Sequence, residues 1–77
     1  MDTRHVIPRR IRIIRYYAVA EAAARSERAG QYFHAAKLWR SATFLALNNA
    51  NRIWAENRCD FCLRVLHNGW SDEHANE

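Results

Sequence analysis

The stretch YYAVAEAAARSERAGQYFHAAKLWRSATFLALNNANRIWAENRCDFC, residues 16–62, decides the fold of this 77-residue chain. Its first part is rich in alanine and ends at Gly30, one of only two glycines in the sequence. Glycine readily adopts the left-handed conformation that a helix C-terminus often requires, so Gly30 predicts the end of a first helix. The aromatic and alanine positions that follow recur at helical spacing and predict a second helix running back along the first.

We expect one all-α domain over residues 11–69, with helices at residues 11–29, 32–47 and 50–67. Pro8 suits the start of the first helix, because the N–H that proline lacks would be unpaired there. Asn48 and Asn49 separate the second helix from the third, since asparagine tolerates left-handed turns and caps helices. Residues 11–15 are β-branched and nearly alternating, as in a strand, but the sequence offers no second strand to pair with them.

The first two helices are expected to pack closely. Small alanines allow two antiparallel helices to approach each other, and aromatic rings fill the space between them. Five positions of the hairpin resemble one tetratricopeptide unit: Gly30, Tyr32, Ala35, Trp39 and Ala42. A repeat array needs about three units for stability, and no second copy is visible. We therefore expect a single antiparallel helical hairpin with the third helix packed on its open side.

Charged residues are concentrated at the two ends of the chain. Residues 1–15 contain five arginines against one acidic residue, and residues 70–77 contain three acidic residues and no lysine or arginine. We expect residues 1–10 to form a basic N-terminal arm and residues 70–77 to form a flexible acidic tail. A basic arm either contacts nucleic acid or an acidic partner, or keeps a small protein soluble. The candidate contact residues are Arg9, Arg10, Arg12 and Arg15.

Nothing in the sequence points to an enzyme, and we expect neither a metal nor a cofactor. Cys59 and Cys62 have the spacing of a metal or redox motif, but zinc requires four ligands and only His67 and His74 follow them. Both cysteines fall on the apolar face of the third helix, where cysteine packs as a small hydrophobe. The histidines are scattered through different segments, and two glycines cannot make a glycine-rich phosphate loop.

The sequence shows no recognisable targeting or membrane segment. The N-terminus lacks the apolar run of a signal peptide, and no stretch approaches the ~18 consecutive apolar residues of a membrane span. We therefore expect a cytoplasmic protein with no membrane partner.

The order of residues after the first helix is specific. Gly30 is followed by Gln31-Tyr32, Ala35-Ala36, Leu38-Trp39, Asn51-Arg52, Trp54, Arg58 and the two cysteines that flank Phe61. This order resembles the ANR family, small bacterial regulators that restrain AraC-type transcription activators. The resemblance covers 47 of the 77 residues. It implies a repressor that binds an AraC-type virulence activator and impairs its dimerisation or DNA occupancy, and it allows contact with a histone-like nucleoid protein.

Two other function classes fit the sequence. One is a small DNA-binding transcription factor that uses the basic N-terminal arm, and the other is a structural helical interaction module. The hairpin around Gly30 could be a helix-turn-helix, but its turn is very short and its second helix carries only one lysine and one arginine. We therefore expect direct DNA contact to be weak or absent.

One flank of the third helix is a candidate protein-binding surface, made of Trp54, Arg58, Phe61 and Val65. Aromatic residues around an arginine are typical of interface hot spots, and a partner could supply a carboxylate to the arginine. The alternative is that Trp54 and Phe61 wrap around the edge of the core. Because the nine aromatic residues exceed what a small three-helix core can cover, we also expect a homodimer or another homo-oligomer.

Overall fold

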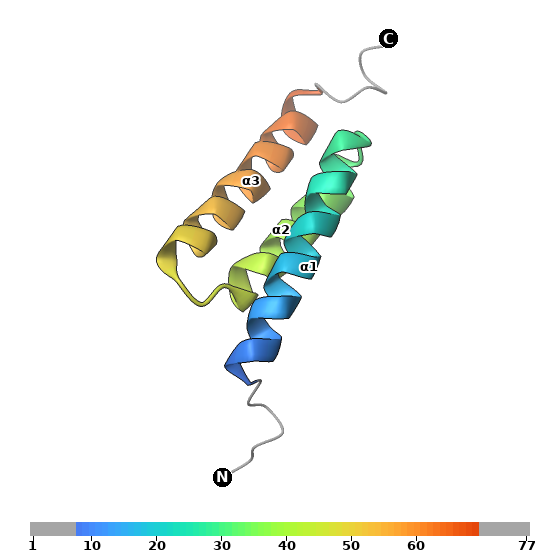
Figure 1. Cartoon of the computed structure of the whole chain (residues 1–77). Helices are drawn as coiled ribbons and strands as arrows, with labels where there is room; N and C mark the ends of the chain where they lie inside the picture. The colour runs from blue at the N-terminus through green and yellow to red at the C-terminus, as the bar shows by residue number, and fades with distance from the viewer. Residues whose placement is uncertain (1–7, 70–77) are drawn as a thin grey trace.

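The computed structural model describes residues 8–69, which form three α-helices and no strand (Figure 1). The helices are α1 (Arg9–Arg28), α2 (Tyr32–Leu45) and α3 (Asn49–Asn68). α1 and α2 form a hairpin, α3 returns along α2, and the main helix packing is between α1 and α2 and between α2 and α3. The predicted all-α hairpin with a third packed helix is confirmed. None of the helices within residues 8–69 combines the length and the apolar character that a membrane span requires.

The first helix begins earlier than the sequence predicted. α1 starts at Arg9, because the N–H of Arg12 already donates to the carbonyl of Pro8 at 2.9 Å. Residues 11–15 are helical, and no strand is present for them to join in the part of the chain that the structure describes. Arg9 and Arg10 therefore belong to α1 and not to an arm. Residues 1–7 of the predicted arm and the predicted acidic tail lie outside the described residues.

α2 ends at Leu45, two residues before the predicted end, and an arginine of α1 contacts this end. The side chain of Arg12 donates from Nη2 to the carbonyl of Phe44 at 2.8 Å and from Nε to the carbonyl of Leu45 at 3.2 Å. Carbonyls in the last turn of a helix lack partners within it and form the negative end of the helix dipole, so a guanidinium is favourable there. α2 has no basic residue in its own last turn. Arg12 is therefore engaged within the fold.

Gly30 ends α1 as predicted, with a φ of 78°. The N–H of Gly30 donates to the carbonyl of Glu27 at 3.0 Å, and the N–H of Gln31 donates to the carbonyl of Ser26 at 2.8 Å. This pair of bonds is a Schellman motif, which satisfies carbonyls that the end of a helix leaves free. The motif reverses the chain over a short link, so that α2 can begin at Tyr32.

Asparagine and glycine bound the third helix. The Asn48 side chain caps α3 by accepting a hydrogen bond from the N–H of Asn51 at 2.7 Å. Gly69 follows the last turn in the left-handed conformation, with a φ of 71°. α3 starts at Asn49 and ends at Asn68, one residue beyond the predicted range at each end.

The core is built mainly from small side chains. Six of the ten buried hydrophobic residues are alanines, and the largest side chain below 2% exposure is that of Cys62. Tyr16 from α1 and Trp39 from α2 are the two large residues among the ten. Alanine at the contacts lets the helices approach closely, as the sequence predicted, but each alanine buries little apolar surface. Hydrophobic burial therefore stabilises this fold less than it would a core of leucine and isoleucine.

One carboxylate joins all three helices close to the turn between α1 and α2. Glu27 of α1 accepts hydrogen bonds from the indole Nε1 of Trp39 in α2 and from the guanidinium of Arg58 in α3. The side chains of Glu27 and Arg58 are 11% and 31% exposed. The hydrogen bond to Glu27 raises the pKa of Arg58 above its ordinary value. α1 and α3, which have little direct packing, are thus connected through this ion pair, which we call the Glu27 bridge.

We predict that Glu27→Gln lowers the free energy of unfolding by roughly 2 kcal/mol, because Arg58 would stay partly buried without its counter-charge. Urea unfolding followed by circular dichroism measures the change. The matched control is Glu21→Gln on the exposed side of α1, which should cost less than about 0.5 kcal/mol. Equal unfolding midpoints for Glu27→Gln and the natural sequence would show that the bridge does not stabilise the fold.

The two cysteines pack as the sequence predicted. Cys62 is fully buried, and burial, together with the nearby Glu27 carboxylate, raises its pKa to about 12. Cys59 is half-buried, and its Sγ lies 3.5 Å from the carbonyl oxygen of Ala36. Burial raises the pKa of Cys59 as well. Both thiols therefore stay protonated at neutral pH, and the thiolate is the reactive form.

In a Cys59→Ser variant, we predict that a thiol reagent modifies Cys62 at pH 8 only as fast as the protein unfolds, because the site is closed to solvent. A Cys62→Ala variant, which keeps half-buried Cys59, should react faster under the same conditions. Modification of Cys62 at the rate of a free thiol would contradict its burial.

Because the raised folded-state pKa of Cys62 favours the protonated thiol, the stabilisation from Cys62 should be present below about pH 9 and fall between about pH 9 and 12.

Candidate protein-binding groove

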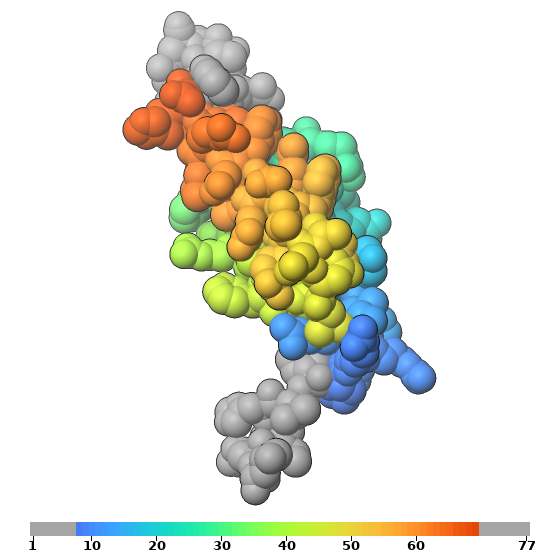
Figure 2. All heavy atoms as spheres, turned by 90° about the vertical axis from the view of Figure 1, so that its left-hand side faces the viewer, coloured from blue at the N-terminus to red at the C-terminus, as the bar shows by residue number. Residues whose placement is uncertain are grey.

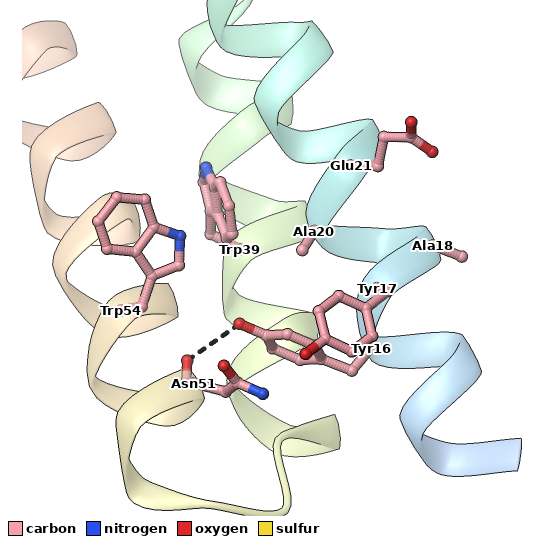
Figure 3. A pocket seen from close by; sticks show the side chains of 8 residues that line it. All are labelled: Tyr16, Tyr17, Ala18, Ala20, Glu21, Trp39, Asn51 and Trp54. Atoms are coloured by element: carbon pink, nitrogen blue, oxygen red, sulfur yellow. Dashed lines mark hydrogen bonds between the residues drawn. The ribbon is translucent and has the colours of Figure 1, made fainter. Parts of the chain in front are cut away.

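A groove of about 650 Å³ lies between α1 and α3, with α2 as its floor (Figure 3). Trp54 of α3 stands on one side, Tyr17 of α1 on the other, and the indole of Trp39 lies between them on α2. The lining also extends over the outer side of α1, where Ala18 and Glu21 point away from α3. We call this feature the α1–α3 groove; its lining residues are Tyr16, Tyr17, Ala18, Ala20, Glu21, Trp39, Asn51 and Trp54.

Two polar crossings hold the walls of the groove together. At one end, the hydroxyl of Tyr16 donates to the backbone carbonyl of Asn51 at 3.1 Å. Beyond the lining residues, toward the α1–α2 turn, the Glu27 bridge connects α1 to α3 through Arg58. Tyr16 and Glu27 are eleven residues apart on α1, which is about 16 Å along a helix. The groove is therefore fixed by the fold and does not depend on a partner to form.

The rims of the groove carry exposed aromatic rings. Trp54 is 56% exposed and Tyr17 is 59% exposed. The ring of Tyr17 meets that of Tyr16 edge to face, with the centroids 5.1 Å apart. The guanidinium carbon of Arg58 lies 5.9 Å from the centroid of the Trp54 ring, a cation–π distance. These contacts orient both aromatic side chains while leaving more than half of their surface open to solvent.

The four residues predicted as a protein-binding flank of α3 do not form one exposed surface. Trp54 is exposed, but Phe61 is half-buried and stands edge-on to Tyr32, with the ring centroids 6.3 Å apart. Val65 is only 4% exposed and belongs to the core, because α3 is turned so that Ala55, Cys62 and Val65 are buried. Phe61 thus packs at the edge of the core, which was the alternative interpretation of this residue.

Arg58 obtains its carboxylate from within the chain. The sequence suggested that a binding partner would supply it, whereas Glu27 of α1 does so. The Arg58 guanidinium also lies over the ring of Phe61, 4.5 Å from its centroid. Arg58 is therefore a side chain that orients its aromatic neighbours and connects two helices, and its charge is already neutralised.

The four arginines predicted to contact nucleic acid or an acidic partner have different environments. Arg12 is engaged by the end of α2. Arg9, Arg10 and Arg15 are exposed on the first two turns of α1. Only these three are accessible for a partner.

The sequence did not indicate Tyr16 and Tyr17 as groove residues, nor Glu27 as the residue that connects the helices on either side of the groove. A signal for Glu27 was present, because it continues the inner stripe of Tyr16, Ala20 and Ala23 at spacings of four, three and four. A carboxylate on such a stripe requires a buried partner. Tyr17 carried no comparable signal, since it neighbours a core residue and could equally well have been buried.

The exposed apolar surface extends beyond the groove. Nine large hydrophobic residues are at least 40% exposed: Ile11, Ile13, Ile14, Tyr17, Phe33, Phe44, Ile53, Trp54 and Leu63. These residues are distributed over all three helices, and exposed apolar surface marks a contact with another protein where such residues lie side by side. Figure 2 shows α3 across one face of the molecule, with the first turns of α1 at the end where α3 begins.

Comparison with known proteins gives no relative from which to infer a function. No protein-family model, no curated protein and no solved structure matches the chain. The geometry of the groove and the residue pattern over residues 16–62 are therefore the basis for a functional proposal.

We predict that Trp54 and Phe61 differ in their contribution to stability, although both are aromatic residues of α3 near Arg58. Trp54→Ala should change the free energy of unfolding by less than about 1 kcal/mol, because most of the ring is in solvent. Phe61→Ala should cost roughly 2 kcal/mol or more, because the ring packs on Tyr32 and the core. Urea unfolding of the two variants provides the comparison, and a larger loss for Trp54→Ala would place Trp54 in the core.

Proposed function

We propose that this chain is a protein-binding regulator whose α1–α3 groove takes a helix of a transcription activator of the AraC type. The observation that carries the proposal is a groove between helices that the Tyr16–Asn51 hydrogen bond and the Glu27 bridge hold together. The rims of this groove are the exposed rings of Tyr17 and Trp54. The type of partner comes from the resemblance of residues 16–62 to the ANR family. The same resemblance leads us to propose negative regulation.

The shape of the groove suits a helix. Its lining runs from Tyr16 to Glu21 on α1 and from Asn51 to Trp54 on α3, which is roughly one turn of each helix. Recognition of a helix in a groove uses apolar anchors one turn apart, and tyrosine and tryptophan are enriched among residues that contribute most of the binding energy. The groove is also open along its length, which suits a protein segment better than an enclosed small molecule.

Binding of this kind would account for repression. An activator whose helix is held in the groove would lose the surface that this helix contributes to dimerisation or to DNA contact, and its occupancy at a promoter would fall. A histone-like nucleoid protein is a second partner that the resemblance allows. The exposed residues outside the groove, such as Phe44 and Leu63, are available for a second copy of the chain.

We predict that the chain removes an AraC-type activator of its own bacterium from a target promoter without shifting that DNA by itself. A gel-shift titration at about 150 mM salt, where non-specific phosphate contacts weaken, measures the concentration needed. Light scattering of the free chain first establishes its oligomeric state. The double variant Tyr17→Ala, Trp54→Ala should require about 30-fold more protein, since loss of hot-spot residues costs roughly 2 kcal/mol.

The matched control is Phe33→Ala, which removes an equally exposed aromatic ring on α2 outside the groove. This variant should be as potent as the natural sequence. The proposal fails if the double variant is equally potent, or if the activator stays on DNA at every concentration. Tight, sequence-selective shifting of DNA by the chain alone would favour a DNA-binding transcription factor instead.

A further inference from the structure

The α1–α3 groove continues past the Tyr16–Asn51 crossing toward the start of α1. A smaller pocket of about 120 Å³ lies there, and it shares Tyr16, Tyr17 and Asn51 with the groove. The remaining residues around this pocket are Arg9, Ile13, Leu45, Leu47 and Asn48. Its lining is thus partly apolar, with one guanidinium at its edge.

Three residues of α1 form a line from the pocket to the groove. Arg9, Ile13 and Tyr17 are four residues apart, so they lie above one another on one side of the helix. Their character changes along the line, from a cation through an aliphatic side chain to an aromatic ring. Ile13 is 40% exposed, and Arg9 is exposed. A segment lying in the groove and extending along this line would meet these side chains in that order.

The charged residues at the start of α1 are all positive. Over residues 8–20, the chain has four arginines and no acidic residue, and α1 has no acidic residue in its first turn. Arg12 is engaged by the carbonyls at the end of α2, but Arg9 and its neighbour Arg10 have no ion pair within the described residues. Across residues 8–69 there are eleven lysines or arginines and four acidic residues, a net charge of +7.

The other end of the groove differs. There the positive charge of Arg58 is already paired with Glu27, so that crossing offers no free cation from this pair. A partner segment in the groove therefore experiences a gradient along its path. Arg9, which lines the 120 Å³ pocket, has no ion pair among residues 8–69, whereas Arg58 is neutralised by Glu27. Arg25 and Arg28 lie in the last turn of α1 but line neither the groove nor the pocket. The gradient gives the groove a direction.

We infer that the occupant of the groove is an amphipathic helix with one acidic end, and that this end lies over Arg9 and Arg10. An apolar side chain of the occupant enters the 120 Å³ pocket beside Ile13, and further apolar side chains contact Tyr17 and Trp54. This assignment rests on the proposed function for the use of the groove, and it adds the chemistry and the direction of the bound segment. Charge complementarity of this kind fixes the register of a complex more than its total affinity.

Nucleic acid fits this surface less well. Phosphate contacts are made by lysine and arginine and do not require apolar side chains. Ile13, which lines the pocket, lies between Arg9 and Tyr17 on the same line. An acidic amphipathic helix satisfies the guanidinium groups and covers the apolar residues together. We therefore favour a protein segment over DNA or RNA as the occupant.

Three synthetic helical peptides test the inference with the full chain. They share one leucine-rich face and differ only in their first three residues, which are glutamate, glutamine or lysine. Fluorescence anisotropy with labelled peptides gives the affinities. The glutamate peptide should bind roughly fivefold more tightly than the glutamine peptide, and the lysine peptide should bind most weakly. The preference should shrink as salt is raised, because the arginines are exposed.

Arg9→Glu should abolish the preference for the glutamate peptide or reverse it in favour of the lysine peptide. The matched control is Arg28→Glu, which makes the same change in net charge on the exposed surface of α1 but in its last turn. This control should keep the preference. Ile13→Ser should weaken the binding of all three peptides to the same extent, because it removes part of the apolar lining of the pocket.

The outcomes separate the inference from the proposed function. One outcome is that the double variant Tyr17→Ala, Trp54→Ala lowers the affinity for all three peptides, while the natural sequence binds the three with equal affinity. In that case the groove is a binding site, and the inferred direction of the bound segment is wrong. A preference that Arg28→Glu removes as fully as Arg9→Glu also overturns the inference, since it would reflect net charge alone. If no peptide binds, the inference fails, and the activator titration decides the proposed function separately. Tight binding of a DNA duplex at about 150 mM salt that Arg9→Glu abolishes would assign the arginines to nucleic acid.

Discussion

The carboxylate of Glu27 is the interaction on which the arrangement of the three helices depends. It accepts from the indole of Trp39 and from the guanidinium of Arg58, so that α1, α2 and α3 meet at one group. Few other contacts connect α1 with α3, since both helices pack mainly on α2. A mostly buried carboxylate is stable only when its hydrogen bonds are made, and both donors are present here. The bridge therefore fixes the distance across the groove as well as stabilising the fold.

The small residues of the core have a consequence for the surface. Alanines at the helix contacts bring the helices close together and leave little room for large side chains between them. The isoleucines of α1 and many of the aromatic residues consequently remain on the outside, where they are at least 40% exposed. A chain that buries alanine and exposes tryptophan, tyrosine and isoleucine has its stronger apolar surface available for another protein. The groove concentrates part of that surface between two walls that the fold already holds in place.

The sequence predicted most of the fold because local signals agree with one another. Gly30 and Asn48 mark the two links, and the alanines of α2 mark its inner face, so helix number and order follow from spacing alone. Long-range contacts could not be predicted in the same way. Nothing near Arg12 in the sequence indicates that it satisfies the carbonyls of Phe44 and Leu45, and a residue 31 positions away supplies the partner of Arg58. The sequence wrongly placed Val65 on an exposed flank. The rotation of α3 about its axis is set by its packing on α2, and helical periodicity alone does not determine that rotation.

The most direct measurement follows the indole N–H signals of Trp39 and Trp54 by nuclear magnetic resonance while an AraC-type activator is added. Trp39 reports on the Glu27 bridge and Trp54 on the rim of the groove. We expect the Trp54 signal to shift or broaden on binding, while the Trp39 signal keeps its hydrogen-bonded position because the bridge holds the walls in place. A Trp54 signal that stays unchanged while the activator is bound would contradict the groove as the binding site. Loss of the hydrogen-bonded Trp39 signal on binding would contradict a preformed groove.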